Sequence, residues 1–127
     1  MPFAASVPEK HAKKYFFLDN NFDSYKFMTN CVMTKKLGSK KLAAAIHPYD
    51  MTCRPHILNK HENKDYERLI MEFGKLSGIY ALLNTSFNLH GFPIINTLSD
   101  AINILKKSNL DGLLLKECLI IKRWNLK

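Results

Sequence analysis

The sequence predicts an α/β fold in which helices flank a mixed sheet. Two segments, Lys64–Ser77 and Leu98–Lys107, carry apolar residues at the spacing of an amphipathic helix. A continuous apolar run at 79–83 is typical of a buried strand, and residues 113–121, rich in Leu and Ile, are a further strand candidate. Because the two patterns alternate and no repeat or linker interrupts them, we expect a single domain over residues 1–127.

The helix expected over Lys64–Ser77 is marked at both ends. Asn63 is a favourable N-cap residue, and Gly78 permits the left-handed conformation that ends many helices. Asp65 and Glu67 suit the positive end of the helix dipole. The apolar stripe consists of Tyr66, Leu69, Ile70, Phe73 and Leu76.

The helix expected over Leu98–Lys107 begins with a Thr-x-x-Asp capping arrangement formed by Thr97 and Asp100. Its apolar face consists of Ala101, Ile102, Ile104 and Leu105. Four further elements are predicted by weaker patterns: a short helix with proline in its first turn at 8–17, and strands at 27–33, 42–46 and 93–95.

The composition is that of a globular domain. The chain has 127 residues, 46% hydrophobic and 24% charged, and no apolar run approaches the roughly 18 residues of a membrane-spanning helix. The first eight residues lack a basic region ahead of an apolar stretch. Three scattered cysteines are typical of reduced thiols. We therefore expect a cytoplasmic protein without a membrane partner.

The net charge of +8 is compatible with nucleic acid, but only three of the 19 basic residues are arginines. The lysines are spread along the chain, and their one cluster, at 35–41, is expected on a solvated loop. No aromatic platform for stacking bases stands out. Nucleic acid is thus disfavoured as a partner, and a phosphate-bearing small ligand fits the charge equally well.

The segment 82–91 indicates a site for a polar ligand. Two apolar residues run into a polar group that consists of Asn84, Thr85, Ser86 and Asn88. Burying an amide or hydroxyl without a partner costs roughly 1–3 kcal/mol, so such a group is expected to meet a ligand or to form a polar turn. It follows the predicted strand 79–83, and the ends of strands are favoured ligand positions in α/β sheets.

A second signal places a carboxylate, a hydroxyl and a guanidinium at alternate positions, on Asp50, Thr52 and Arg54. An arginine can donate two parallel hydrogen bonds to a phosphate or acyl oxygen pair. The alternative is that Arg54 pairs with Asp50 on the surface.

Other arrangements are weaker. His47, Cys53, His56 and His61 have irregular spacing for zinc, so no metal is expected. Ser86 does not lie in a Gly-x-Ser-x-Gly elbow, and His90 fits a turn. Neither a phosphate-binding P-loop nor a dinucleotide glycine motif is present.

The order of these motifs resembles the C-terminal domain of the NodU/CmcH-type carbamoyltransferases. The family's Asp-Gly-Thr-Ala-Arg is matched at residues 50–54, and its Asn-Thr-Ser-Phe-Asn with a following Gly-Glu-Pro-Ile at 84–88 and 91–94. Its Arg-Pro-Phe-Ala-Pro-Ser-Val and Thr-Pro-x-Asp-Ala stretches are similar to residues 1–7 and 97–101. The resemblance covers residues 2–121.

The resemblance implies a YrdC-like fold with an open twisted mixed sheet that binds ATP and carbamoyl phosphate. It implies formation of carbamoyl adenylate, with release of pyrophosphate, and carbamoyl transfer to a hydroxyl of a small-molecule or sugar acceptor by an N-terminal domain of the sugar-kinase type. By this resemblance Arg54 and Ser86 are the candidate catalytic residues. The candidate substrate- and nucleotide-binding residues are Asp50, Thr52, Asn84, Thr85 and Asn88.

Three positions depart from the family pattern: its glycine is Met51, its glutamine is His56 and its glutamate is Phe92. The family's basic segment upstream of residue 1 is not in the sequence. We therefore expect activity only with a separate chain that carries the N-terminal half. Two alternatives stay open: a non-catalytic remnant that serves as an interaction module, and, with less support, an RNA-binding protein.

Overall fold

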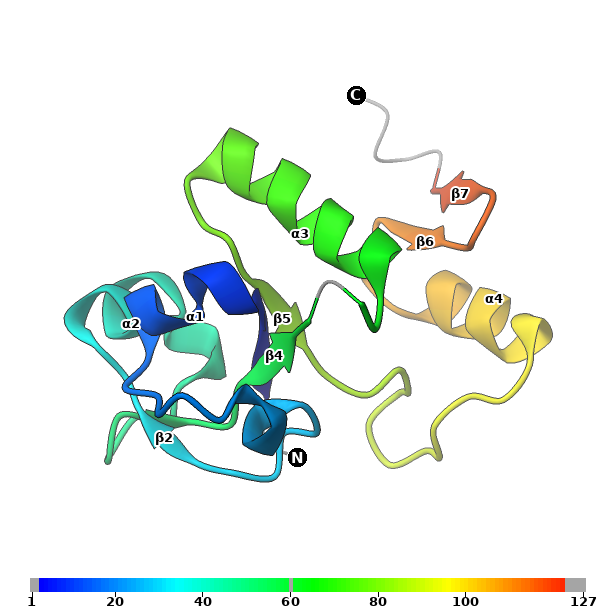
Figure 1. Cartoon of the computed structure of the whole chain (residues 1–127). Coiled ribbons are helices and arrows are strands. Elements are labelled where there is room, and N and C mark those ends of the chain that lie inside the picture. The colour runs from blue at the N-terminus through cyan, green and yellow to red at the C-terminus, as the bar shows by residue number, and fades with distance from the viewer. Residues whose placement is uncertain (1–2, 60, 123–127) are drawn as a thin grey trace. The chain divides into compact units, whose positions relative to one another are not determined.

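The computed structural model describes residues 3–59 and 61–122, and the contacts of the chain gather in two compact units, Met1–Thr85 and Ser86–Lys127 (Figure 1). The first unit contains, in chain order, β1 (Ala4–Pro8), α1 (Glu9–Tyr15), η1 (Phe22–Tyr25), β2 (Val32–Met33), α2 (Lys36–Lys41), η2 (Ala43–Ala45), β3 (Thr52–Cys53), β4 (His56–Leu58), α3 (Lys64–Ser77) and β5 (Leu82–Asn84). The second unit contains α4 (Leu98–Lys107), β6 (Gly112–Leu114) and β7 (Leu119–Ile121). The predicted α/β class is confirmed.

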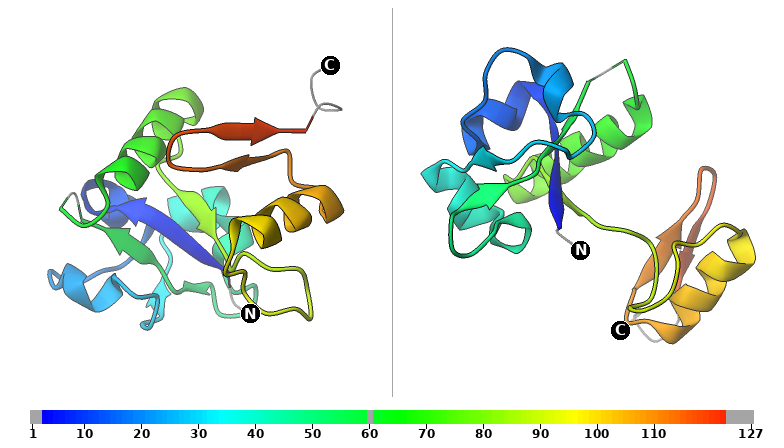
Figure 2. Two further views of the ribbon diagram at one scale, coloured as in Figure 1. Left: turned by 90° about the vertical axis from the view of Figure 1, so that its right-hand side faces the viewer. Right: turned by 90° about the horizontal axis from the view of Figure 1, so that it is seen from below.

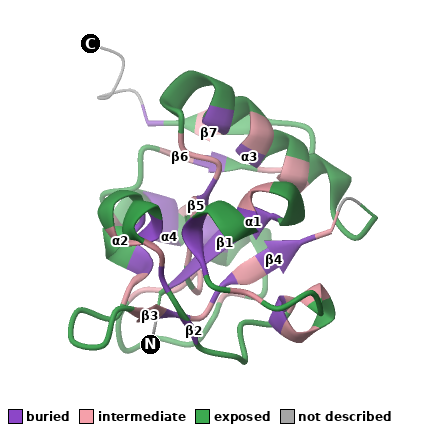
Figure 3. Cartoon of the chain, turned by 60° about the vertical axis from the view of Figure 1, so that its left-hand side comes forward, coloured by how far each residue is buried: buried purple, intermediate pink, exposed green. Residues whose placement is uncertain are grey.

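A three-stranded mixed sheet organises the first unit, with β1 between β4 and β5 (Figure 2). β1 runs parallel to β4, with Ser6 opposite His56, and antiparallel to β5, with Ala4 opposite Asn84. All five residues of β1 are buried, and α1 and α3 both contact this strand (Figure 3). The sequence did not predict β1, because Ala-Ala-Ser-Val-Pro contains a single β-branched residue.

The main apolar cluster of the first unit lies on one side of this sheet. Ala5 and Val7 contribute from β1, and Tyr15 and Phe16 contribute from the end of α1. Side chains alternate between the two faces of a strand, so Ser6, between Ala5 and Val7, faces the opposite side. That side carries the polar residues described below.

The helix predicted over Lys64–Ser77 is confirmed. The Asn63 side chain accepts from the Tyr66 amide at 3.1 Å, and Gly78 ends the helix with a φ of 73°. Of its apolar stripe only Ile70 is fully buried; Leu76 is 90% exposed. The apolar spacing therefore predicted the helix correctly, but not how much of the stripe would be packed.

The strand predicted at 79–83 begins later, as β5, and lies at the edge of the sheet with Leu83 50% exposed. The preceding residues contact helix α1 instead of pairing in the sheet. The Tyr80 amide donates to Tyr15 Oη at 3.0 Å, and the Tyr80 ring stacks on His11 with centroids 3.9 Å apart. A strand is therefore present, but it is shorter than predicted, and it lies at the edge of the sheet instead of being buried.

Three N-terminal predictions need correction. Residues 43–45 form a 3₁₀ turn instead of a strand, in keeping with the helical preference of alanine. Of the strand at 27–33 only Val32–Met33 remains, because Met28 has a φ of 57°, which breaks extended backbone. The lysines at 36, 40 and 41 are exposed, but they lie on helix α2 and not on a loop, with Lys35 as its N-cap residue. The helix predicted at 8–17 is α1, with Pro8 as its N-cap residue.

In the second unit the helix at Leu98–Lys107 and its capping box are confirmed. The single strand predicted at 113–121 is an antiparallel hairpin, β6–β7, that turns at Lys116 and Glu117, where Leu115 N–H donates to the Cys118 carbonyl at 2.8 Å. Residues 93–95 are not a strand, and Ile94 is 65% exposed. None of the helices in the described residues is long and apolar enough to cross a membrane.

Candidate functional site

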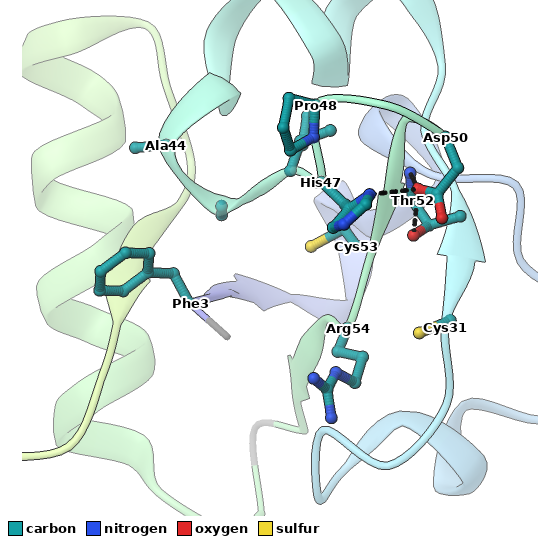
Figure 4. A pocket seen from close by; sticks show the side chains of 11 residues that line it. Phe3, Cys31, Ala44, His47, Pro48, Asp50, Thr52, Cys53 and Arg54 are labelled. Carbon is teal, nitrogen blue, oxygen red and sulfur yellow. Dashed lines mark hydrogen bonds and ion pairs between the residues drawn. The ribbon is translucent and has the colours of Figure 1, made fainter. Parts of the chain in front are cut away.

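Asp50, Thr52 and Arg54 line one cavity of about 340 Å³ in the first unit (Figure 4). β3 carries Thr52, and Arg54 lies in the two-residue link between β3 and β4. The remaining lining residues are Phe3, Cys31, Ala44, Ala45, Ile46, His47, Pro48 and Cys53. The structure therefore brings the three residues of this predicted signal to one cavity.

Asp50 organises the turn that enters β3. Its Oδ1 accepts from the Thr52 amide at 2.9 Å and from the Thr52 hydroxyl at 2.7 Å, and it lies 3.2 Å from His47 Nδ1. The Thr52 hydroxyl and amide hold the pKa of the Asp50 carboxyl below its ordinary value, with a smaller contribution from His47. Asp50 thus holds Thr52 in place, and its ion-pair partner is His47 and not Arg54.

Arg54 points away from Asp50 (Figure 4), and the residue is half-buried. Across residues 3–59 and 61–122 no hydrogen bond or ion pair engages its guanidinium. The alternative of a surface pair with Asp50 is therefore wrong. A partly desolvated guanidinium without an anionic partner has its donors available to a phosphate or carboxyl oxygen.

Met51 stands where the sequence pattern has a glycine, and its φ is 58°, in the left-handed region that favours glycine. The turn is held in spite of this, because the Met51 carbonyl accepts from Thr34 N at 3.1 Å and from Thr34 Oγ1 at 2.7 Å. Met51 also donates its amide to the His47 carbonyl at 3.0 Å. Met51 therefore adopts the left-handed backbone conformation typical of glycine, although it has a side chain.

Asn84 belongs to a polar cluster with His56 and Ser6. His56 Nδ1 lies 3.0 Å from Ser6 Oγ and 3.3 Å from Asn84 Nδ2, and Asn84 Nδ2 lies 3.5 Å from Met28 Sδ. Ser6 is fully buried, whereas His56 and Asn84 are half-buried. Burial lowers the pKa of His56, and the charge of Glu62 opposes that effect.

The other polar residues of the segment 82–91 lie in loops. Thr85 is exposed at the end of the first unit, and Ser86 begins the second unit and is half-buried. Asn88 Nδ2 donates to the carbonyls of Leu89 at 3.1 Å and Phe92 at 2.8 Å, so its amide stabilises the turn that contains Gly91, whose φ is 81°. For Asn88 the polar-turn interpretation holds.

Within residues 3–59 and 61–122, no three His, Cys, Asp or Glu side chains gather closely enough to hold a metal ion. Of the four residues weighed as ligands, His47 pairs with Asp50 and His56 contacts Ser6 and Asn84. Cys53 is 2% exposed, and its burial raises the pKa of the thiol, which disfavours the thiolate that metals bind.

Sequence reasoning missed three residues that the geometry places at these sites: Ser6, Met28 and Phe3. Phe3 and Ser6 lie in residues 1–7, which are similar to a family motif, and that similarity could have indicated them. Met28 carries no sequence signal, since its contact with Asn84 joins residues 56 positions apart.

Comparison with known proteins gives a consistent match. Residues 1–122 match the family model described as carbamoyltransferase C-terminus. Nodulation protein NolNO of Sinorhizobium fredii is 35% identical over 96% of this chain and 18% of its own length. Nodulation protein NolO of Bradyrhizobium diazoefficiens is 34% identical over 96% of this chain and 22% of its own length. The uncharacterized protein MJ1051 of Methanocaldococcus jannaschii is 38% identical over 96% of this chain and 23% of its own length.

Proposed function

Since the chain belongs to the carbamoyltransferase C-terminus family, we propose that it binds ATP and carbamoyl phosphate as the C-terminal part of an O-carbamoyltransferase. In this role it takes part in forming carbamoyl adenylate: water releases phosphate from carbamoyl phosphate, and an oxygen of the resulting carbamate displaces pyrophosphate from ATP. The carbamoyl group then passes to a hydroxyl of a small-molecule or sugar acceptor.

The observation that carries the proposal is the state of Arg54. Arg54 is half-buried and lines a cavity of about 340 Å³, and its guanidinium has no partner among the described residues. A bidentate guanidinium contact matches phosphate and carbamoyl oxygens in shape and charge. Such a contact stabilises the charge that develops on oxygen during phosphoryl-type chemistry.

The neighbouring polar residues have supporting roles in this proposal. Asp50 orients the Thr52 hydroxyl beside the cavity, so Thr52 presents a fixed polar group to the ligand. Asn84 and Thr85 line the adenylate, and Ser86 contributes a hydroxyl to the reacting groups. Asn88 acts on the same loop by holding its turn.

The chain spans about a fifth of the length of the curated relatives it matches. We therefore place the acceptor-binding step on a further part of the enzyme, outside residues 1–127. The acceptor is recognised there and not by the residues described above.

The proposal is tested by isothermal titration of the chain with ATP, AMP and carbamoyl phosphate. Binding is expected, and Arg54→Ala should weaken it at least tenfold, or about 1.4 kcal/mol. Arg68→Ala is the matched control, because Arg68 is an exposed arginine on α3 outside the cavity. Absence of binding of all three ligands at millimolar concentration would overturn the proposal, as would equal effects of the two variants.

A second candidate, a non-catalytic interaction module of the same fold, is favoured by Met51. A side chain at a φ of 58° adds strain and bulk where the family pattern has glycine. Phe92, at the family's glutamate position, is 66% exposed, as an interaction residue would be. A folded chain that binds none of the three ligands would favour this candidate.

A further inference from the structure

Three polar side chains from three different strands share one face of the central sheet. Ser6 of β1 is the register partner of His56 of β4, and Asn84 of β5 is the partner of Ala4, two residues from Ser6. Residues two apart on a strand face the same side, so all three side chains lie on the face opposite the main apolar cluster. The distances of 3.0 Å and 3.3 Å to His56 Nδ1 join them into one network.

The orientation of the Asn84 amide follows from its neighbours. Met28 Sδ, 3.5 Å away, is a thioether sulfur and can only accept, so the nitrogen of the amide must face it. The same nitrogen lies 3.3 Å from His56 Nδ1 and donates there. His56 Nδ1 is therefore an acceptor and the ring proton is on Nε2. The Ser6 hydroxyl can rotate, and it shares the single lone pair of Nδ1 with the Asn84 amide as a second donor.

Both amide hydrogens of Asn84 are used within the protein, whereas its Oδ1 receives no hydrogen bond from the residues that the structure describes. The groups around His56 keep this arrangement in place. Ser6 and Asn84 are uncharged, and the ring centroid of Tyr66 in α3 lies 6.4 Å from that of His56. Among the residues that the structure describes, Glu62 is the one charged group that acts on His56. Burial favours the neutral ring, which is the acceptor form.

We propose that His56 is a positioning residue, which holds the Asn84 amide so that Oδ1 accepts a hydrogen bond from an N–H group of the ligand. This inference rests on the proposed function. The two proposed ligands share the chemistry required, because the carbamoyl NH₂ and the adenine amine are both N–H donors on a trigonal carbon. A reversed amide would present N–H to N–H and repel either of them.

Paired ligands separate the two sources of this donor. Acetyl phosphate replaces the carbamoyl NH₂ by a methyl group, and inosine triphosphate replaces the adenine amine by a carbonyl oxygen. One of the two pairs, carbamoyl over acetyl phosphate or ATP over inosine triphosphate, should be discriminated about tenfold by the wild-type chain. The pair that is discriminated identifies the group that meets Asn84.

Variants test the role of His56 against a merely structural one. His56→Leu removes the acceptor and should bring the discrimination ratio close to one, as should Asn84→Ala. His56→Gln retains an acceptor oxygen and should restore the ratio, which a loss of packing alone would not do. His61→Leu, an exposed histidine of the following loop, is the matched control and should leave the ratio unchanged.

The outcomes are distinct. Binding of both members of each pair with equal affinity would overturn the inference and leave the proposed function standing, whereas absence of binding of every ligand would overturn both. A readout without ligand is the nitrogen spectrum of His56 in the free chain, which should show the proton on Nε2. A proton on Nδ1 of the neutral ring would contradict the inference. This readout uses the wild-type chain, so it remains decisive if His56→Leu fails to fold.

Discussion

Met51 adopts a backbone conformation that favours glycine, and its side chain is 40% exposed. A residue with a Cβ in the left-handed region is strained by roughly 1–2 kcal/mol, while glycine costs roughly 0.5–1 kcal/mol more to order on folding. The strain is held by the two hydrogen bonds from Thr34 to the Met51 carbonyl.

Met51→Gly should therefore raise the free energy of unfolding by roughly 0.5–1 kcal/mol, the difference between these two terms. The measurement is the urea midpoint followed by circular dichroism. Met33→Gly, at an exposed methionine on strand β2, is the control and should lower the midpoint. A lower midpoint for Met51→Gly would contradict the assignment of strain.

His56 makes the stability depend on pH. Because burial lowers its pKa below the ordinary value of 6.5, the folded chain binds fewer protons at His56 than the unfolded chain does on the acid side. Its contribution is complete above 6.5 and declines as the pH falls toward the folded-state pKa.

His56→Gln does not titrate, so its stability should fall less than that of the wild-type chain between about pH 7.5 and 5.5. A residual decline is expected, because burial, followed by Lys14 and Lys10, also lowers the pKa of His11. Urea midpoints at the two pH values measure the effect. If the stability of both proteins declined equally between the two pH values, His56 would not be the source of the pH dependence.

At the residue scale, local spacing accounts for part of what the structure shows. Asp50 and Thr52 lie two residues apart, and their pairing in one turn follows from that spacing. The free state of Arg54 could not be foreseen, since it depends on His47 taking the Asp50 carboxylate. The link of Ser6, His56 and Asn84 depends on strand pairing across 50 and 28 positions, which no local pattern encodes.

At the scale of elements, the two long helices α3 and α4 were predicted well because their signals lie within the helix, whereas α2 was expected to be a loop. α3 and α4 have the predicted bounds, set by Asn63 and Gly78 for one and by the Thr97–Asp100 box for the other. The strands are two to five residues long, and most were missed or misplaced. Such short strands are selected by their partners and not by their own composition.

The capping box of α4 gives an element-scale prediction. Thr97 Oγ1 accepts from the Asp100 amide at 3.2 Å, and Asp100 Oδ2 accepts from the Thr97 amide at 3.1 Å and from the Thr97 hydroxyl at 2.7 Å. Thr97→Ala removes the cap and should destabilise the second unit by about 1 kcal/mol. Amide hydrogen exchange in α4 measures the change.

Ser99→Ala is the matched control for this prediction, because Ser99 lies in the same exposed first turn outside the capping box. It should leave exchange in α4 close to that of the wild-type chain. Equal acceleration of exchange in both variants would mean that the box does not stabilise the helix end.

At the scale of the whole molecule, the α/β class and the family followed from the sequence, because alternating patterns and ordered motifs survive in a single chain. The grouping of contacts into two units did not follow, since it depends on which residues meet across the chain. The net charge of +8 bears on the proposed site, because any anion is attracted to exposed lysines such as those of α2. A test of the proposed site therefore has to show which residues the ligand contacts, and not only that it binds.

The most direct measurement is a nitrogen–proton NMR titration of the chain with ATP and with carbamoyl phosphate. The account predicts that amide signals from residues 50–56 and 82–85 shift with saturation, and that Arg54→Ala abolishes these shifts while Arg68→Ala preserves them. Shifts confined to Lys36–Lys41 and unchanged by Arg54→Ala would show charge attraction alone, and would contradict a carbamoyl and nucleotide site at Arg54.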